Sequence, residues 1–347
     1  MIPDARSLTR EVLTRCVVDP PVGFEWFGRR IDVDGDPADD PREAFLRSLA
    51  LHLYLHVYCQ GNAVERLPTA RPCGVGEVRA LLTAHSFANP ERTRWDTGWT
   101  FVGSSRDSYL VRREGIDFSV PTDGIRPVRD DTLRAGREVQ VLVPADRWSR
   151  SPGFMLFDGR DLLPPRSEGD RRTRLYLDMD EEGARWVIGL CGRFNHEGLP
   201  FGLKVAGHPA EYDRCDTVVL FVARDDYPVA SRIMVEAAIG APPRPRPGVP
   251  AFTRRLAAGV SVADDPATGE SFGESRCRLL AGGILRGHDA GADTIESRMD
   301  EVEACFLDEG LTLDRPHLES GSVEYEIGPW ALWPTNGPAP GPSSVRP

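Results

Sequence analysis

The chain has 347 residues and a formal net charge of −11, with 40% hydrophobic and 27% charged residues. This composition is typical of a folded globular protein, and the negative charge argues against a general nucleic-acid-binding protein, which would present a basic surface to phosphates. No apolar run resembles a signal peptide or a membrane span, so we expect no membrane partner and a cytoplasmic location. The seven cysteines contain no C-x-x-C pair and predict neither a disulfide framework nor a thiolate metal site.

The first third of the chain predicts a helix followed by a small sheet. Residues 41–60 are rich in Leu and Val and stop at Gly61, as a helix packed on most sides does. Residues 99–102, 108–111 and 116–120 are short alternating or aromatic runs, typical of antiparallel strands. We therefore expect an N-terminal helical and small-sheet region over residues 1–120.

The remaining chain predicts one α+β domain over residues 121–333. Strands are expected at 138–143, 174–178, 201–205, 217–222 and 252–256, and helices at 181–194, 228–238, 272–286 and 293–308. Strands and helices do not alternate regularly, which favours an α+β fold with a mixed, mainly antiparallel sheet flanked by helices. The proline-rich residues 241–250 predict a stiff extended connector, and residues 334–347 a disordered tail.

Residues 269–273 (GESFG) match the G-x-S-x-G pattern that presents a nucleophilic serine in α/β-hydrolases. The preceding residues are polar, however, and not the buried strand that such an elbow requires. Ser271 followed by Glu274 also forms a capping box ahead of an apolar run. The pattern therefore favours a helix start, with a serine hydrolase left as a minor alternative.

Two pairs of residues, one of histidines and one of aspartates, have the spacing of metal ligands. His52 and His56 would share one helix face, but they lack the glutamate of H-E-x-x-H and an evident third ligand. Asp178 and Asp180 lie where a strand leads into a helix, and a helix cap is the more common meaning of that arrangement. Packed histidines and a helix cap are therefore favoured, with a magnesium site at Asp178 and Asp180 left as a remote alternative.

The 42 basic residues include a single lysine, Lys204. In a strand over residues 201–205, Lys204 and Gly202 point to one face and Leu203 and Val205 to the other. A lysine amine can lose its proton when desolvated or crowded by cations, which an arginine cannot do. Lys204 is therefore either a catalytic base or a lysine whose stem covers apolar surface while its amine reaches water.

The neighbours of Lys204 favour chemistry on a phosphate. Arginine forks bind phosphate oxygens bidentately and lower the pKa of a nearby lysine. A lysine base beside an arginine-bound phosphate suits β-elimination, in which a Cα proton is removed and phosphate departs, with no metal or organic cofactor required. The expected catalytic residues are Lys204, His208, Tyr212 and Asp216, with His208 and Tyr212 as candidate proton donors, and the expected phosphate ligands are Arg193, Arg214, Arg254 and Arg276.

Four segments carry a resemblance to a known family: LPFGLKV (199–205), YDRCDTVVLF (212–221), FTRRL (252–256) and GESFGESRCRLL (269–280). Residues 53–58 and 95–99 extend it more weakly, so that it spans most of the chain. The chain resembles the HopA-type family of type III effectors and, more closely, actinobacterial relatives encoded beside lanthipeptide and thioamitide precursor peptides.

This resemblance implies a bacterial phosphoserine/phosphothreonine lyase of peptide natural-product (RiPP) biosynthesis. Its substrate would be a precursor peptide phosphorylated by a separate kinase-like phosphotransferase, and its products dehydroalanine and dehydrobutyrine. Lys204 occupies the matching lysine position, and Arg214, Asp216, Glu270 and Arg276 lie on matching motif positions. Residues 252–256 depart from the family, which has a lysine at 254 or 255, and this weakens a role for them in proton transfer.

The alternative is a non-catalytic subunit. Effector relatives that act by binding host proteins keep open a phosphopeptide- or precursor-binding partner of the phosphotransferase. Such a subunit would use the same arginines without proton transfer.

Overall fold

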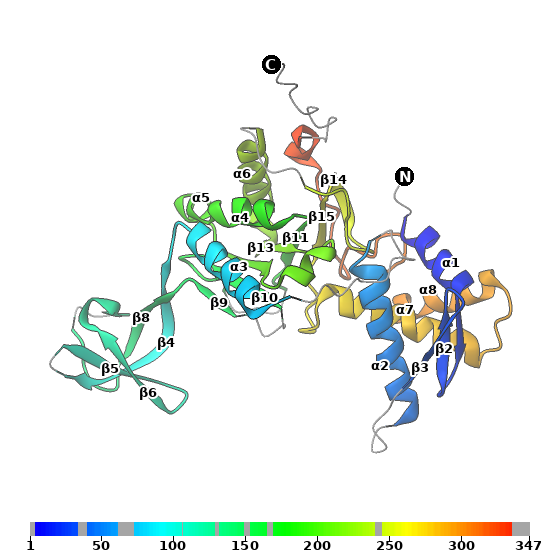
Figure 1. Ribbon diagram of the computed structural model, residues 1–347, viewed down its shortest axis with the longest axis horizontal. Coiled ribbons are helices and arrows are strands. Elements are labelled where there is room, and N and C mark those ends of the chain that lie inside the picture. Colours follow the sequence, from blue (N-terminus) through cyan, green and yellow to red (C-terminus); the bar gives the residue numbers. More distant parts are fainter. Residues whose placement is uncertain are drawn as a thin grey trace.

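The computed structural model describes residues 4–33, 40–61, 73–105, 107–128, 132–148, 153–164, 169–239 and 245–334. These residues form three sheets and the helices that surround them (Figure 1). Every described strand pair is antiparallel. The predicted α+β class is confirmed.

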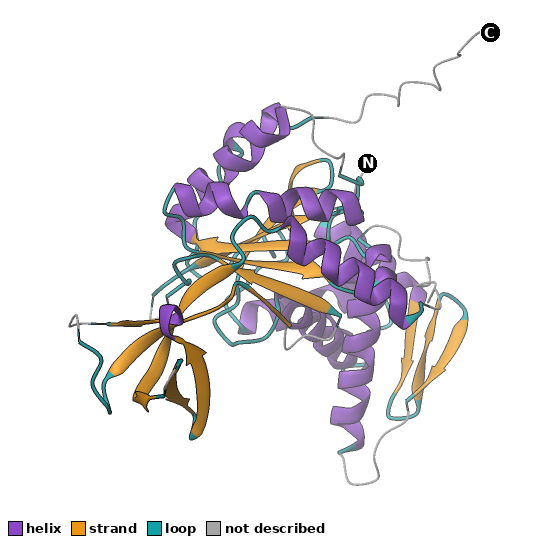
Figure 2. Ribbon diagram, turned by 60° about the vertical axis from the view of Figure 1, so that its left-hand side comes forward, coloured by secondary structure: helices purple, strands orange, loops and turns teal. Residues whose placement is uncertain are grey.

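A seven-stranded sheet forms the centre of the molecule. Its strand order is β14 (Arg254–Ala257), β15 (Val260–Asp264), β11 (Arg172–Leu177), β13 (Val218–Ala223), β12 (Phe201–Ala206), β10 (Phe154–Asp158) and β9 (Asp146–Trp148). Helices lie on both sides of this sheet (Figure 2). The strands predicted at 174–178, 201–205 and 217–222 are three adjacent central strands.

One face of the sheet is covered by α3 (Val75–Ala88), α4 (Glu181–Gly189), α5 (Cys191–His196) and α6 (Tyr227–Ile239). Leu203, Val205 and Leu220 point from the sheet into this core and are fully buried. The single helix predicted over 181–194 is instead two helices, because α4 ends at Gly189 and α5 begins at Cys191, with Leu190 as the cap between them. The prediction missed α3.

The opposite face is covered by α1 (Ala5–Arg15), α2 (Pro41–Leu53), η1 (Tyr54–Tyr58), α7 (Phe272–Asp289) and α8 (Ile295–Asp308). A three-stranded sheet of β1 (Cys16–Asp19), β2 (Gly23–Trp26) and β3 (Arg29–Asp32) packs with them. α7 starts with the predicted capping box, in which Ser271 and Glu274 bond each other's backbone N–H groups. The helix predicted over 41–60 is α2 continued as the π-helical turn η1.

A five-stranded sheet with its own small core projects from the rest of the chain (Figure 1). Its order is β6 (Ile116–Pro121), β5 (Ser108–Arg113), β4 (Thr93–Ser104), β8 (Glu138–Pro144) and β7 (Ile125–Pro127). The boundary expected between residues 120 and 121 falls inside this sheet, because β8 pairs with β4. Local patterns show strands but not their pairing across a loop.

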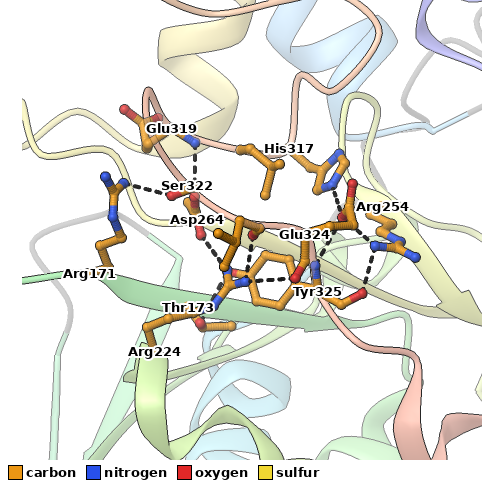
Figure 3. Close-up of polar contacts among 12 residues, drawn as sticks. Arg171, Thr173, Arg224, Arg254, Asp264, His317, Glu319, Ser322, Glu324 and Tyr325 are labelled. Carbon is orange, nitrogen blue, oxygen red and sulfur yellow. Dashed lines mark hydrogen bonds and ion pairs between the residues drawn. The ribbon is translucent and has the colours of Figure 1, made fainter.

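The segment after α8 is held to the edge of the central sheet by a polar network around Asp264 (Figure 3). Its carboxylate accepts hydrogen bonds from Arg224 (2.9 Å), from the Tyr325 hydroxyl (2.6 Å) and from the Glu319 backbone N–H (2.9 Å). Asp264 is only 1% exposed, so these donors replace the water that a carboxylate would otherwise require. Two expected features lie partly outside the described residues: the tail over residues 335–347 and the connector over residues 241–244.

The two histidines at metal-ligand spacing are packed among aromatic rings. His52 lies 4.2 Å from His56, 4.9 Å from Trp26 and 5.1 Å from Phe24 between ring centroids. In the described ranges no group of three or more His, Cys, Asp or Glu side chains could hold a metal ion. Asp178 accepts from Arg246 and the Gly248 N–H, and Asp180 caps α4.

This packing predicts an acid-sensitive fold. Burial, and secondarily His56, lower the pKa of His52 from 6.5 to about 3. As pH falls from about 6.5 toward 3, the unfolded chain binds a proton that the folded chain does not, so the free energy of unfolding decreases. Urea titrations across this range should show the decrease, and His52→Gln should reduce it; an identical pH dependence in the variant would contradict this role.

Candidate functional site

Lys204 lies in the middle of the central sheet. On β12 it stands opposite Leu156 of β10 and Val219 of β13. Lys204 and Gly202 both line one cavity, whereas Leu203 and Val205 are fully buried on the other face, as the alternation predicted. The strand therefore directs the only lysine of the chain away from the apolar core.

The cavity lies on the same face of the sheet as the core that includes η1 and α7. Tyr176, Val219 and Ala263, on β11, β13 and β15, are buried in that core. Next to it, the sheet forms the floor of a cavity of about 500 Å³. It is lined by Arg147, Leu156, Asp158, Leu162, Leu163, Arg172, Arg174, Phe201, Gly202, Lys204, Phe221, Gly269, Ser271 and Glu274.

The Lys204 amine lies in a partly apolar and cationic environment. Its Nζ is 3.9 Å from the centroid of the Phe154 ring. The pKa of Lys204 is lowered to about 8, mainly by burial. Asp216 opposes this shift, Arg214 and Arg174 contribute to it, and Glu274 opposes it. A substantial fraction of the amine is therefore neutral in mildly alkaline solution and can accept a proton.

Arg214 and Asp216 form a buried pair beside this amine. The guanidinium donates to both carboxylate oxygens of Asp216, at 2.7 and 2.8 Å, and to the Tyr54 hydroxyl at 2.8 Å. Burial would raise the pKa of Asp216, but Arg214 outweighs burial and keeps this pKa below its ordinary value. Glu211 also accepts from Arg214 at 3.1 Å, so protein groups occupy the guanidinium. Arg214 therefore holds the neighbouring side chains in place and is not the first candidate to bind phosphate.

The π-helical turn η1 completes this pair. In η1 the rings of Tyr54 and Tyr58 stack at 5.2 Å, and the Tyr54 hydroxyl is the one that meets Arg214. A Cβ on Gly273 would lie 2.5 Å from Tyr58 and 2.7 Å from Tyr54. The second residue of α7 must therefore be glycine for the two tyrosines to fit, and π-helical turns are common at functional sites.

The two predicted proton donors do not line the cavity. His208 caps η3 (Pro209–Asp213), with Nδ1 accepting from the Ala210 N–H at 3.2 Å. The Tyr212 hydroxyl lies 2.7 Å from His85 Nε2 and donates to the Ala206 carbonyl at 3.1 Å. Burial raises the pKa of Tyr212, so its proton is held more firmly than usual.

Three of the predicted phosphate ligands lie elsewhere. Arg193 is 48% exposed on α5 and pairs with Glu236 on the far side of the sheet. Arg254 on β14 donates to the Tyr325 carbonyl and pairs with Glu324. Arg276 is fully buried and donates to the Pro316 carbonyl and to Glu319, so it anchors the C-terminal segment. Arg193 thus lies across the sheet from Lys204, and Arg254 and Arg276 are engaged by the C-terminal segment, so position in the chain was a poor guide.

The arginines that do line the cavity are Arg147, Arg172 and Arg174, which sequence reasoning missed. Arg174 stacks over the Phe221 ring at 5.1 Å and donates to Asp265 at 2.5 Å. Arg147 donates to both oxygens of Asp158, at 2.7 and 3.3 Å. A signal existed, since Arg172 and Arg174 are two residues apart on β11 and must point to the same face as each other.

Ser271 also lines the cavity, but as a helix cap. Its Oγ accepts from the Glu274 backbone N–H at 3.2 Å, and Glu274 accepts from the Ser271 N–H at 3.0 Å. Glu270 pairs with Arg278 at 3.1 Å. This arrangement agrees with the capping box and supplies no base to activate the serine.

The model of the HopA1 effector protein family matches residues 145–318, half of the chain. The chain belongs to the HopA1 effector family. The matched region contains Lys204, the cavity around it and the Arg214–Asp216 pair. No curated protein sequence matches the chain.

Two solved structures of effector proteins are similar to the chain. The effector from Pseudomonas syringae pv. syringae strain 61 is 14% identical, with a TM-score of 0.44, and the match covers 79% of this chain and 96% of the effector. The effector from Pseudomonas syringae pv. tomato strain DC3000 is 14% identical, with a TM-score of 0.43, and the match covers 83% and 93% of the two chains. In the described part of this chain no helix has the length and apolar character to cross a membrane.

Proposed function

We propose that this HopA1-family chain is a phosphoserine/phosphothreonine lyase whose general base is Lys204. The observation that carries the proposal is that the one lysine among 42 basic residues projects into an arginine-lined cavity, where burial lowers the pKa of its amine to about 8. General bases are most effective when their pKa lies near the working pH. An arginine at this position would supply charge but could not accept a proton.

The proposed reaction uses only groups of this chain. The neutral Lys204 amine takes the Cα proton of the phosphorylated residue, the electron pair of that bond forms the Cα–Cβ double bond, and the Cβ–O bond breaks. Phosphate leaves with the electron pair of the broken bond, and the alkene is dehydroalanine or dehydrobutyrine. Arg147, Arg172 and Arg174 bind the phosphate, so its departure requires no protonation by His208 or Tyr212.

The substrate and its supply follow from this chemistry. The ester must come from a phosphotransferase, and we propose a separate kinase-like enzyme that phosphorylates a precursor peptide in lanthipeptide or thioamitide biosynthesis in the cytoplasm. The resemblance to biosynthetic relatives supports this context, and the four segments that carry it lie within the residues matched by the HopA1 family model. The decisive experiment follows a phosphoserine peptide by mass and by free phosphate. Loss of phosphoric acid to a thiol-reactive alkene supports a lyase, whereas restored serine would mean a phosphatase.

The pKa of Lys204 predicts the pH dependence. Since only the neutral amine is a base, kcat/KM should rise with pH, with its midpoint near pH 8, and level off above it. Initial rates of phosphate release from about pH 6 to 10 measure this, because the substrate phosphate is already dianionic over most of that range. A profile that falls with rising pH would contradict a lysine base.

The second candidate is a phosphopeptide-binding partner of the phosphotransferase. The cavity arginines favour it independently, because they can hold a phosphate whatever the protonation state of Lys204. Phosphopeptide binding without elimination, even with the cognate precursor and its phosphotransferase present, would decide for this candidate. The minor hydrolase alternative predicts labelling of Ser271 by a fluorophosphonate, and we expect none.

A further inference from the structure

Gly202 leaves bare backbone at the floor of the Lys204 cavity. A Cβ built on it would meet Leu163 at 3.8 Å, Phe221 at 3.9 Å and the Asp158 carboxylate at 4.0 Å, all ordinary contacts. An alanine would therefore fit without disturbing the fold. Glycine weakens the interior of a strand, and there it often marks a place where a ligand or another backbone approaches closely.

The register of the sheet places cationic side chains on both sides of this bare backbone. Asp158 and Phe221 stand directly opposite Gly202 on the two neighbouring strands, and Arg174 stands opposite Phe221 on the next. Arg174 stacks over Phe221, and Arg147 is bonded to Asp158. One row across four strands thus runs from Asp158 over Gly202 and Phe221 to Arg174. Arg147 stands in the neighbouring row, opposite Leu156, and reaches this row through its bonds to Asp158.

Lys204 lies in the adjacent row, two residues along the same strand. Two residues of strand span about 6.6 Å. The Lys204 Nζ lies over the Phe154 ring, and Phe154 stands opposite Ala206. The lysine side chain must therefore turn toward Gly202 for its amine to reach the Cα proton of an ester bound there.

We propose that the phosphate binds over the backbone of Gly202, between Arg147 and Arg174. We call this binding site the phosphate seat. The inference rests on the proposed function for the identity of the ester, and it adds that inorganic phosphate, the second product, binds the same seat and inhibits competitively. A phosphomonoester dianion is the class of group that two flanking guanidiniums select. Both already pair with carboxylates, Arg147 with Asp158 and Arg174 with Asp265, so the phosphate must share or displace these partners.

Asp158 allows Arg147 to exchange its carboxylate partner for the phosphate. It shares Arg147 with the incoming phosphate, and its own burial, at 9% exposed, would make a bare carboxylate costly. Arg94 lies 3.5 Å from the same carboxylate and is itself bonded to Asp96 at 2.8 Å. When Arg147 turns to phosphate, Asp158 therefore keeps a buried counter-ion.

The test titrates inorganic phosphate into the wild type, Gly202→Ala and Gly202→Leu by calorimetry. Gly103→Ala is the matched control, since Gly103 lies on β4 with no atom within 4 Å of the added Cβ. We expect at least a tenfold loss of phosphate affinity in Gly202→Ala and no measurable binding in Gly202→Leu, with the control unchanged. Gly202→Ala decides the matter if the leucine variant fails to fold.

Elimination assays on the same proteins separate this inference from the proposed function. Wild-type protein that does not bind phosphate, or Gly202→Ala that binds it normally, would overturn the phosphate seat even if the wild type eliminates. Binding that depends on Gly202 in a wild type that does not eliminate would support the seat while refuting the lyase. Competitive inhibition by phosphate, weakened in Gly202→Ala, would support the seat within a working lyase.

Discussion

Replacing Lys204 with arginine is expected to lower the rate of phosphate elimination by about 10²- to 10⁴-fold, the usual contribution of a general base. The substitution keeps a positive charge over Phe154 and beside Asp216, so the cavity retains its attraction for phosphate. It removes the amine that the mechanism uses as its base, because a guanidinium is not deprotonated in proteins. Single-turnover assays with a phosphoserine peptide measure the loss.

The control for this prediction is Arg232→Ala, which removes an exposed arginine of α6 that pairs with Glu197 far from the cavity. It should eliminate at the wild-type rate. Phosphopeptide affinity in Lys204→Arg should stay within a few-fold of the wild type, which distinguishes lost chemistry from lost binding. Full elimination activity in a folded Lys204→Arg protein would refute the proposed mechanism.

Replacing Asp216 with asparagine is expected to lower the free energy of unfolding by about 3–5 kcal/mol, the usual result of removing one partner of a buried ion pair. The Asp216 side chain is 5% exposed and accepts two hydrogen bonds from Arg214, which would lose its main counter-ion. Because Asp216 opposes the shift of Lys204, its loss should also lower the pKa of the amine further. The midpoint of the pH–rate profile should move to lower pH.

Urea unfolding and the pH–rate profile of the same variant check both effects. Glu197→Gln is the matched control, since it breaks an exposed ion pair with Arg232 whose loss should cost at most about 1 kcal/mol. A variant Asp216→Asn as stable as this control would show that the buried pair contributes little. An unchanged midpoint would show that Asp216 does not influence Lys204.

Much of the secondary structure could be predicted from the sequence, because its signals are local. The capping residues Ser271 and Glu274 mark the start of α7, and the alternation over residues 201–205 correctly places Lys204 and Gly202 on one face. Weaker local signals failed: α1, α3 and the three-stranded sheet were missed, and residues 181–194 were predicted as one helix.

The candidate site was predicted only where it lies within one or two elements. Lys204, Arg214 and Asp216 are close in the chain and close in space. The expected ligand Arg276 is fully buried, because the segment after α8 returns over it and supplies carbonyl acceptors. Arg147 and Arg174 reach the cavity from strands on opposite sides of β12. Their positions in the sequence do not indicate that either arginine lies near Lys204.

Composition and local pattern therefore determined that the chain is an α+β protein and that a lone lysine leaves an apolar strand. Only the tertiary structure decided which arginines surround that lysine. Strand register aligns residues far apart in sequence, here Asp158, Gly202, Phe221 and Arg174, into one row. Register depends on how all the buried faces pack together, and no single segment contains that information.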